Sequence, residues 1–268
     1  MTEKYNASNI SLDQILSYIK SGEIAIPEIQ RPFVWKPRQV RDLIDSLYKG
    51  YPTGYLIISQ SPDMKLKDGS LSLGKKIMID GQQRVTALMT AIAGLEVLTN
   101  DFKKRRIKIA FNPQASEENE EEIFKVQDNA ILRDKRWIAD VANLFKPDFD
   151  QWAFVNEYCQ QNPEVNGSEM NRILMRLLDI KNRQIGVITL NKDLNIDEVT
   201  DIFIRINSQG AKLNQADFAM SKIAANTEYG GNALRKAIDY FSHLAVEPDW
   251  YNEMAQDTLF METSYASR

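Results

Sequence analysis

The chain has 268 residues, of which 43% are hydrophobic and 26% are charged, and its net charge is −4 at neutral pH. This is the composition of an ordinary globular protein that buries a sizeable core in one large domain or two moderate ones. The negative charge argues against a protein that coats nucleic acid over its whole surface. No apolar run approaches the ~20 residues that span a bilayer, and the N-terminus lacks the apolar stretch of a signal peptide. We therefore expect a cytoplasmic protein without a membrane segment.

Cysteine and histidine usage removes several chemistries. Cys159 is the sole cysteine and His243 the sole histidine. An internal disulfide and a thiolate zinc cluster are excluded, and a Ser-His-Asp triad, a Cys-His pair or a histidine-metal nuclease site is disfavoured. We expect no nuclease activity within this chain.

The first third of the chain alternates helices and strands. Ser11 is placed to cap a helix whose apolar stripe runs from Leu12 to Ile19, and Pro37 and Gly50 are placed to open and close a second helix. The predicted strands are 24–26, 55–59, 76–79, 106–111 and 185–190. The later predicted helices are 118–128, 150–161, 168–180, 196–206, 214–226 and 231–244.

This order predicts a mixed α+β or α/β fold with two lobes. Residues 1–115 would form an α/β lobe, and residues 116–268 a mostly helical lobe packed against it. The strand at 185–190 is expected to rejoin the sheet of the first lobe.

The segment Asp80–Arg84 reads Asp-Gly-Gln-Gln-Arg and links an apolar strand to an amphipathic helix predicted to begin after Arg84. Such a turn offers unpaired N–H groups at the positive end of a helix dipole, which suits a phosphate or carboxylate. Gly81 permits a tight turn or a close ligand approach. Arg84 adds charged donors, and Asp80 can face a metal ion or a water. A solvated turn in which Asp80 and Gln82 only satisfy the helix N-terminus is the alternative.

Two further polar segments lie far away in the sequence. Two prolines hold residues 26–35 extended, with Gln30 and Arg31 at the polar centre. In the predicted helix 196–206, Arg205 lies off the apolar stripe, and Asn207 and Gly210 follow at the helix end. Each segment alone also fits ordinary loop structure.

Charge is distributed unevenly between residues 103 and 122. An acidic run at 117–122 is typical of a solvated face. A basic run before it could contact a nucleic-acid backbone. The cations of that run are Lys103, Lys104, Arg105, Arg106 and Lys108.

Taken together, the three polar segments resemble the N-terminal domain family of GmrSD-type modification-dependent restriction systems, which is related to ParB-like and sulfiredoxin-like nucleotide-binding folds. The resemblance covers roughly residues 10 to 225. The matching positions are Ile26-Pro27 through Gln30-Arg31 and Trp35, then Asp80–Arg84 (Asp-Gly-Gln-Gln-Arg), then Phe203 through Arg205, Asn207 and Gly210. The resemblance implies a nucleotide-binding or NTP-hydrolysing module that serves defence against foreign DNA. A separate nuclease domain or subunit would then perform cleavage.

On this basis we expect an NTPase or NTP sensor assisted by Mg²⁺, with Asp80, Gln83 and Arg84 as the catalytic residues. Asp80 would hold the metal or a water, Gln83 would orient the water or γ-phosphate, and Arg84 would neutralise phosphate charge. The expected nucleotide-binding residues are Gln30, Arg31, Gly81, Gln82, Thr86, Arg205, Asn207 and Gly210.

Two other interpretations remain open. In one, the same groove binds modified foreign DNA without hydrolysis, using Arg31, Arg84 and the basic run. In the other, the chain is a protein-interaction subunit with a vestigial pocket. The sequence leaves the oligomeric state open.

Overall fold

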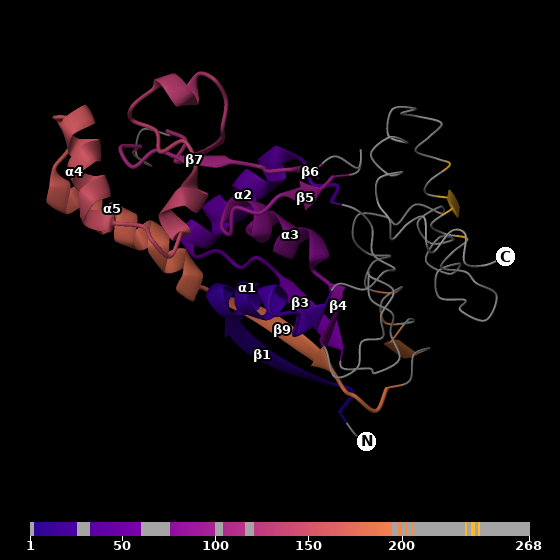
Figure 1. Ribbon diagram of the computed structural model, residues 1–268. Helices are drawn as coiled ribbons and strands as arrows, with labels where there is room; N and C mark the ends of the chain where they lie inside the picture. The colour runs from indigo at the N-terminus through magenta and orange to yellow at the C-terminus, as the bar shows by residue number, and fades with distance from the viewer. Residues whose placement is uncertain are drawn as a thin grey trace.

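The computed structural model describes residues 3–25, 33–59, 76–99, 104–115 and 121–194, together with positions 198–199, 202, 205, 234, 237–238 and 241. A five-stranded mixed sheet with helices packed on it confirms the predicted α+β class. Its strand order is β1-β9-β3-β4-β2 (Figure 1). The strands are β1 (Tyr5–Ser11), β2 (Ile24–Ala25), β3 (Tyr55–Ser59), β4 (Lys76–Asp80) and β9 (Gln184–Leu190).

The late strand β9 lies inside this sheet, as predicted for residues 185–190. It runs antiparallel to β1 and parallel to β3. The chain therefore returns to this sheet more than a hundred residues after β4. On its other side, β3 pairs antiparallel with β4.

Three helices from the first third of the chain lie beside the sheet (Figure 1). They are α1 (Leu12–Lys20), α2 (Pro37–Lys49) and α3 (Gln82–Ala91). The predicted caps of the first two are present: Ser11 Oγ accepts the Gln14 N–H at 3.3 Å, and Gly50 closes α2 with φ 76°. Left-handed backbone at a helix end favours glycine.

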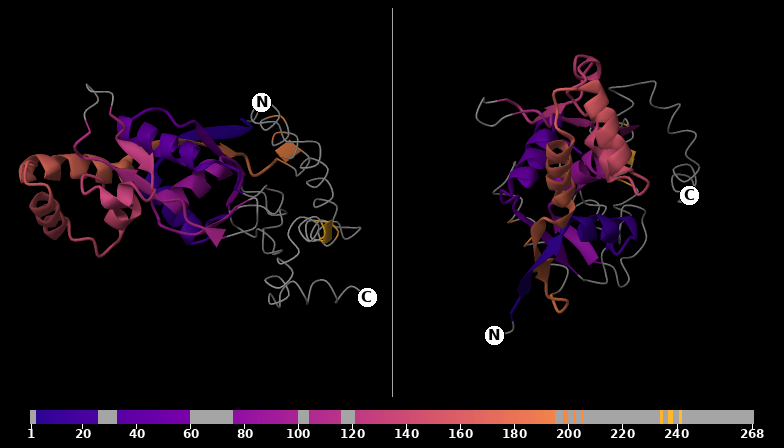
Figure 2. Two further views of the ribbon diagram at one scale, coloured as in Figure 1. Left: turned by 90° about the horizontal axis from the view of Figure 1, so that it is seen from above. Right: turned by 90° about the vertical axis from the view of Figure 1, so that its left-hand side faces the viewer.

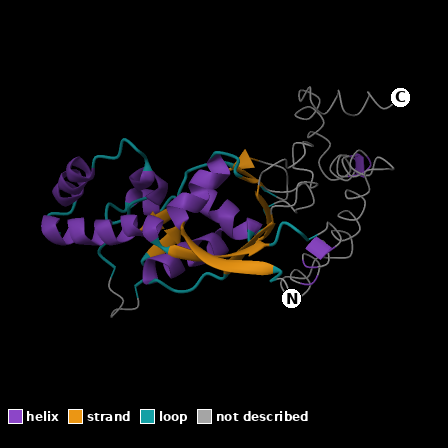
Figure 3. Cartoon of the chain, turned by 90° about the horizontal axis from the view of Figure 1, so that it is seen from below, coloured by secondary structure: helices purple, strands orange, loops and turns teal. Residues whose placement is uncertain are grey.

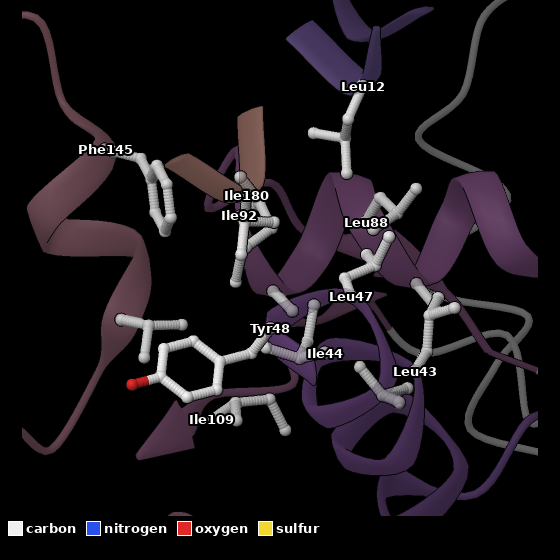
Figure 4. Close-up of a cluster of buried hydrophobic side chains, with 14 of the residues drawn as sticks. Leu12, Leu43, Ile44, Leu47, Tyr48, Leu88, Ile92, Ile109, Phe145 and Ile180 are labelled. Atoms are coloured by element: carbon white, nitrogen blue, oxygen red, sulfur yellow. The ribbon is translucent and has the colours of Figure 1, made fainter. Parts of the chain in front are cut away.

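Successive side chains of β3 and β4 pack into two different apolar clusters, one on each face of the sheet. Leu56, Ile58 and Met78 face a large cluster shared with the helices, part of which is drawn in Figure 4. The next residues along the strands, such as Ile57 and Ile79, pack on the opposite face in a smaller cluster that includes Val199. Both faces of β3 and β4 are thus buried, which explains their continuous apolar sequences.

The remaining elements lie beyond α2 and α3. Two short hairpins pair β5 with β6 and β7 with β8, and the hairpin of α4 and α5 lies at one end of the molecule (Figures 2 and 3). Their bounds are β5 (Val97–Leu98), β6 (Lys104–Arg105), β7 (Ile109–Phe111), β8 (Phe124–Val126), α4 (Gln151–Gln161) and α5 (Gly167–Leu178), with 3₁₀ turns η2 (Ile131–Arg133), η3 (Val141–Phe145) and η4 (Asp179–Asn182).

The predicted helix at 118–128 is wrong over its described part, residues 121–128. This segment instead contains β8, which pairs with β7 and brings the rings of Phe124 and Phe111 to 5.1 Å. Aromatic packing and strand pairing outweigh the helix propensity of a glutamate-rich sequence.

Other boundaries also differ from the prediction. The strand predicted at 106–111 is confined to Ile109–Phe111, because residues 106–108 are irregular. Helix α3 begins at Gln82, not after Arg84. The predicted helices at 214–226 and most of 196–206 and 231–244 lie outside the described residues.

The sequence analysis did not predict β1. This edge strand is exposed along most of its length, so its sequence does not need the apolar alternation of a half-buried strand. It reads Tyr-Asn-Ala-Ser-Asn-Ile-Ser. The two-lobe division at residue 115 stays a prediction, although the large core cluster contains residues from both sides of it, such as Leu88 and Leu174. Within the described residues, no helix combines the length and apolarity that a membrane span requires.

Candidate functional site

The turn between β4 and α3 is built on Gly81. This residue has φ 99° and forms the N-cap of α3, and a Cβ atom there would overlap the side chain of Leu56. A side chain is therefore excluded on two grounds, backbone conformation and space. The Val85 N–H bonds to the Gly81 carbonyl at 3.0 Å, so Gln82, Gln83 and Arg84 form the first helical turn. The N–H groups of a first turn have no partner within the helix.

Arg84 is anchored to the residues around this turn. Its Nη1 donates to the Thr53 carbonyl at 3.1 Å, and its Nη2 lies 3.3 Å from Asp80 Oδ2. The guanidinium also packs against Gly54, where φ is +82° and an added Cβ would lie 2.9 Å from Nη1. The Arg84 side chain is thus placed by the loop before β3 and by the carboxylate one turn earlier.

Burial lowers the pKa of Arg84, and the charge of Asp80 offsets part of that effect. Two of the five guanidinium N–H groups serve the bonds to Thr53 and Asp80. An anion beside the remaining donors would add a second favourable charge to a partly desolvated cation.

Asp80 follows a bulge at the end of β4. The pairing with β3 shifts so that Asp80 stands opposite Ile57, while Met78 stands opposite Ile58. Bulges redirect side chains at sheet ends. The Asp80 side chain is 32% exposed, and within the described residues its Oδ1 atom makes no hydrogen bond.

Gln83 connects the turn to the second polar segment. Its Oε1 accepts the Val34 N–H at 2.9 Å. The neighbouring Phe33 is 3% exposed and forms a bridge with Thr99. The end of the proline-bounded segment is therefore fixed beside the first turn of α3, although Gln30 and Arg31 themselves lie outside the described residues.

The other predicted residues of the site are only partly placed. Gln82 is 6% exposed and Thr86 half-buried, both within α3. Arg205 is helical and exposed. Asn207 and Gly210 lie outside the described residues, so the third segment stays a prediction.

The basic run does not form one continuous cationic face. Arg106 Nη2 lies 2.7 Å from Asp140 Oδ2, and the Asp140 side chain is only 7% exposed. Lys104, Arg105 and Lys108 are exposed, whereas Lys103 lies outside the described residues. Arg106 therefore belongs to the packing between this run and η3, not to an open surface.

The sequence analysis missed the loop at 50–54 as a part of this site. Thr53 supplies a carbonyl to Arg84, and Gly54 leaves room for its guanidinium. The Pro-Thr-Gly sequence at 52–54 indicates a turn. Its proximity to Arg84, however, depends on the pairing of β3 with β4.

Comparison with known proteins identifies the family of the chain. An uncharacterized protein of Methanocaldococcus jannaschii is 23% identical over 233 residues, a match that covers 75% of this chain and 39% of that protein. The chain thus spans about two fifths of the length of the curated relative that it matches. Residues 12–224, which contain the Gly81 turn, Arg84 and the contact between Gln83 and Val34, match the family described as GmrSD restriction endonuclease, N-terminal domain. The chain therefore belongs to the GmrSD restriction endonuclease N-terminal domain family.

Proposed function

We propose that this chain is the NTP-binding and NTP-hydrolysing module of a restriction system, and that it senses modified foreign DNA and regulates a separate nuclease domain or subunit. Membership of the family implies the restriction-system role. The observation that supports the nucleotide site is the arrangement of Arg84, which is anchored beside the open first turn of α3.

In this proposal the phosphates lie against the N-terminus of α3. The N–H groups of Gly81 and Gln82 point to the anion, with Thr86 on the same helix, and Arg84 and Arg31 neutralise its charge. Gln30, next to Arg31 in the sequence, would bind the same nucleotide; Val34, three residues after Arg31, donates its N–H to Gln83.

Gln83 would orient the attacking water or the γ-phosphate. Its Oε1 accepts the Val34 N–H at 2.9 Å, which fixes the side chain beside the first turn of α3. Arg205, Asn207 and Gly210 would close the site from the third segment.

Asp80 is suited to a magnesium ion that also binds phosphate. Magnesium commonly uses one or two carboxylates together with phosphate oxygens and waters. Asp80 presents one partly exposed carboxylate, and no group of three or more His, Cys, Asp or Glu side chains able to hold a metal occurs in the described part of the chain. A single carboxylate fits a magnesium ion that binds together with a nucleotide. Such an ion would neutralise part of the phosphate charge beside Asp80.

The test is phosphate release from each of the four NTPs with Mg²⁺, by wild type, Asp80→Ala and Arg84→Ala. Loss of one electrostatic group should lower the rate by about 10²-fold. Equal rates in all three proteins would contradict the assignment.

The matched control is Arg41→Ala. Arg41 is also a partly buried arginine, since its side chain is 16% exposed and is paired with Asp42 and Glu122. It belongs to α2, however, and donates to the Phe124 carbonyl of β8. This variant should keep the wild-type rate, so a loss of activity in Arg84→Ala alone would report the site and not general destabilisation.

A DNA sensor without hydrolysis is the second candidate, and the exposure of Lys104, Arg105 and Lys108 favours it. Its affinity for modified duplex DNA should fall steeply with salt. Saturable NTP binding beside absent or salt-insensitive DNA binding would leave the nucleotide function alone. A protein-interaction subunit with a vestigial pocket would show no thermal shift with any NTP and Mg²⁺.

A further inference from the structure

The outer edge of β1 is an open sheet edge. In the part of the chain that the structure describes, β1 pairs only with β9, and its other side faces solvent (Figure 1). Residues 5 to 9 are exposed, with Tyr5 58% exposed. A strand edge of this kind carries backbone donors and acceptors that can pair with another strand.

The hydrogen bonds to β9 identify which residues of β1 point outward. The Asn191 N–H bonds to the Lys4 carbonyl at 2.9 Å, and the Leu12 N–H bonds to the Arg183 carbonyl at 3.0 Å. Both contacts continue the register of the β1–β9 pair. Because hydrogen-bonded positions alternate in an antiparallel ladder, the even-numbered residues between them turn their backbone groups to β9. The N–H and C=O groups of Tyr5, Ala7 and Asn9 therefore point away from the sheet.

The usual protections of a sheet edge are missing from β1. The strand contains no charged residue, proline or glycine, and its seven residues pair with β9 without a bulge. Natural edge strands are commonly blocked by lysine, proline, bulges or a covering element. An uncharged, regular seven-residue edge is a template for pairing.

We propose that β1 pairs antiparallel with β1 of a second copy of this chain, so that two five-stranded sheets form one continuous sheet around a two-fold axis at Ala7. In this register Ala7 faces Ala7 of the other copy, and Tyr5 faces Asn9. These are the three residues with outward backbone groups, and each pair exchanges two hydrogen bonds. A two-fold axis makes such an edge complementary to itself.

Charge is compatible with this register. With the axis at Ala7, Glu3 faces Ser11 and Lys4 faces Ile10, so no like charges meet. A shift that places the axis at Ser8 would pair Tyr5 with Ser11, which is the N-cap of α1. The carbonyl of an N-cap residue accepts the first hydrogen bond of its helix and is not available to a second strand.

The test is the mass of the full chain across a concentration series, by sedimentation or light scattering. Wild type should approach twice the 30.7 kDa of one chain. Ala7→Pro removes both central hydrogen bonds of the dimer without removing a bond to β9, and should weaken dimerisation by at least about tenfold. Ala7→Lys should also weaken it, by setting two cations together at the axis.

A charge pair provides the second measurement. Ala7→Glu should be weakened like Ala7→Lys, and mixing the two variants should restore a dimer that neither forms alone. Ala153→Lys is the matched control, because Ala153 is also an exposed alanine but lies in α4, away from β1 (Figure 1). Its dimerisation should equal that of wild type.

A monomer at every concentration, or a dimer unaffected by Ala7→Pro, would overturn the proposal. A dimer sensitive to proline but not to Ala7→Lys would overturn the Ala7 axis. Equal melting temperatures of the variants would exclude unfolding as the cause of any loss.

Discussion

The side chain of Gln83 accepts a hydrogen bond from the backbone N–H of Val34 at 2.9 Å and so joins two segments 49 residues apart. Gln83 lies in the first turn of α3, and Val34 lies in the proline-bounded segment 26–35, of which only residues 33–35 are described. One glutamine thus holds Val34 beside the N-terminus of the helix.

Substitution of Gln83 should measure how much its hydrogen bond to Val34 contributes to stability. Gln83→Leu removes the acceptor of Val34 and should lower the free energy of unfolding by about 0.5–1.5 kcal/mol, since the bond is exposed. Gln83→Glu keeps an acceptor oxygen and should lose less. Urea denaturation of both variants measures the difference, and equal losses would show that the bond contributes little.

Gly54 should be more sensitive to alanine than a glycine of similar conformation elsewhere. Gly54→Ala places a Cβ 2.9 Å from Arg84 Nη1, whereas Gly22, with φ +76°, has no atom within 4 Å of its would-be Cβ. Gly22→Ala should cost about 1–2 kcal/mol from backbone conformation alone. Gly54→Ala should cost a further ~1–2 kcal/mol because the charged hydrogen bond to Thr53 is disturbed. Thermal denaturation compares the pair, and equal losses would mean that Arg84 moves aside freely.

Arg106 and its neighbouring lysines should respond differently to substitution. Asp140→Asn removes the carboxylate that pairs with Arg106 and should cost about 2 kcal/mol, less than the ~3–5 kcal/mol of a fully buried pair, since Arg106 is 22% exposed. The double variant Lys104→Ala, Lys108→Ala should leave stability within about 0.5 kcal/mol and instead lower any DNA affinity at low salt. Denaturation and a salt titration read the two effects separately, and a stable Asp140→Asn protein would contradict a structural role for the pair.

Alkaline pH should weaken the contribution of Tyr158 to the free energy of unfolding. Burial raises the pKa of its phenol to about 12, and its hydroxyl donates to the Arg136 carbonyl at 2.7 Å. A raised pKa favours the neutral phenol in the folded state. The contribution is therefore complete below the unfolded pKa of about 10 and declines as pH rises toward 12.

The measurement is the stability difference between wild type and Tyr158→Phe from pH 8 to 11. It should narrow with pH, by up to on the order of 2 kcal/mol over the full titration. Tyr51→Phe, at a tyrosine that is 60% exposed, is the control for general alkaline effects. A difference that stays constant with pH would contradict the assignment.

Local signals in the sequence were sufficient for α1 and α2, because caps and apolar stripes act within a few residues. Ser11 and Gly50 mark these helix ends both in the sequence and in the structure. The same local approach was wrong at 121–128, where pairing with β7 decides the conformation.

The sequence by itself determined the glycine turn and its charged flanks, since Asp80, Gly81 and Arg84 lie within five consecutive residues and the helix dipole follows from local geometry. Only the tertiary structure decided what Arg84 contacts, because Thr53 and Gly54 reach it through the antiparallel pairing of β3 with β4. It also decided that Arg106 is a packing residue, through an aspartate 34 positions away. Contacts between distant residues depend on the whole fold, whereas caps and turns depend on a few neighbouring residues.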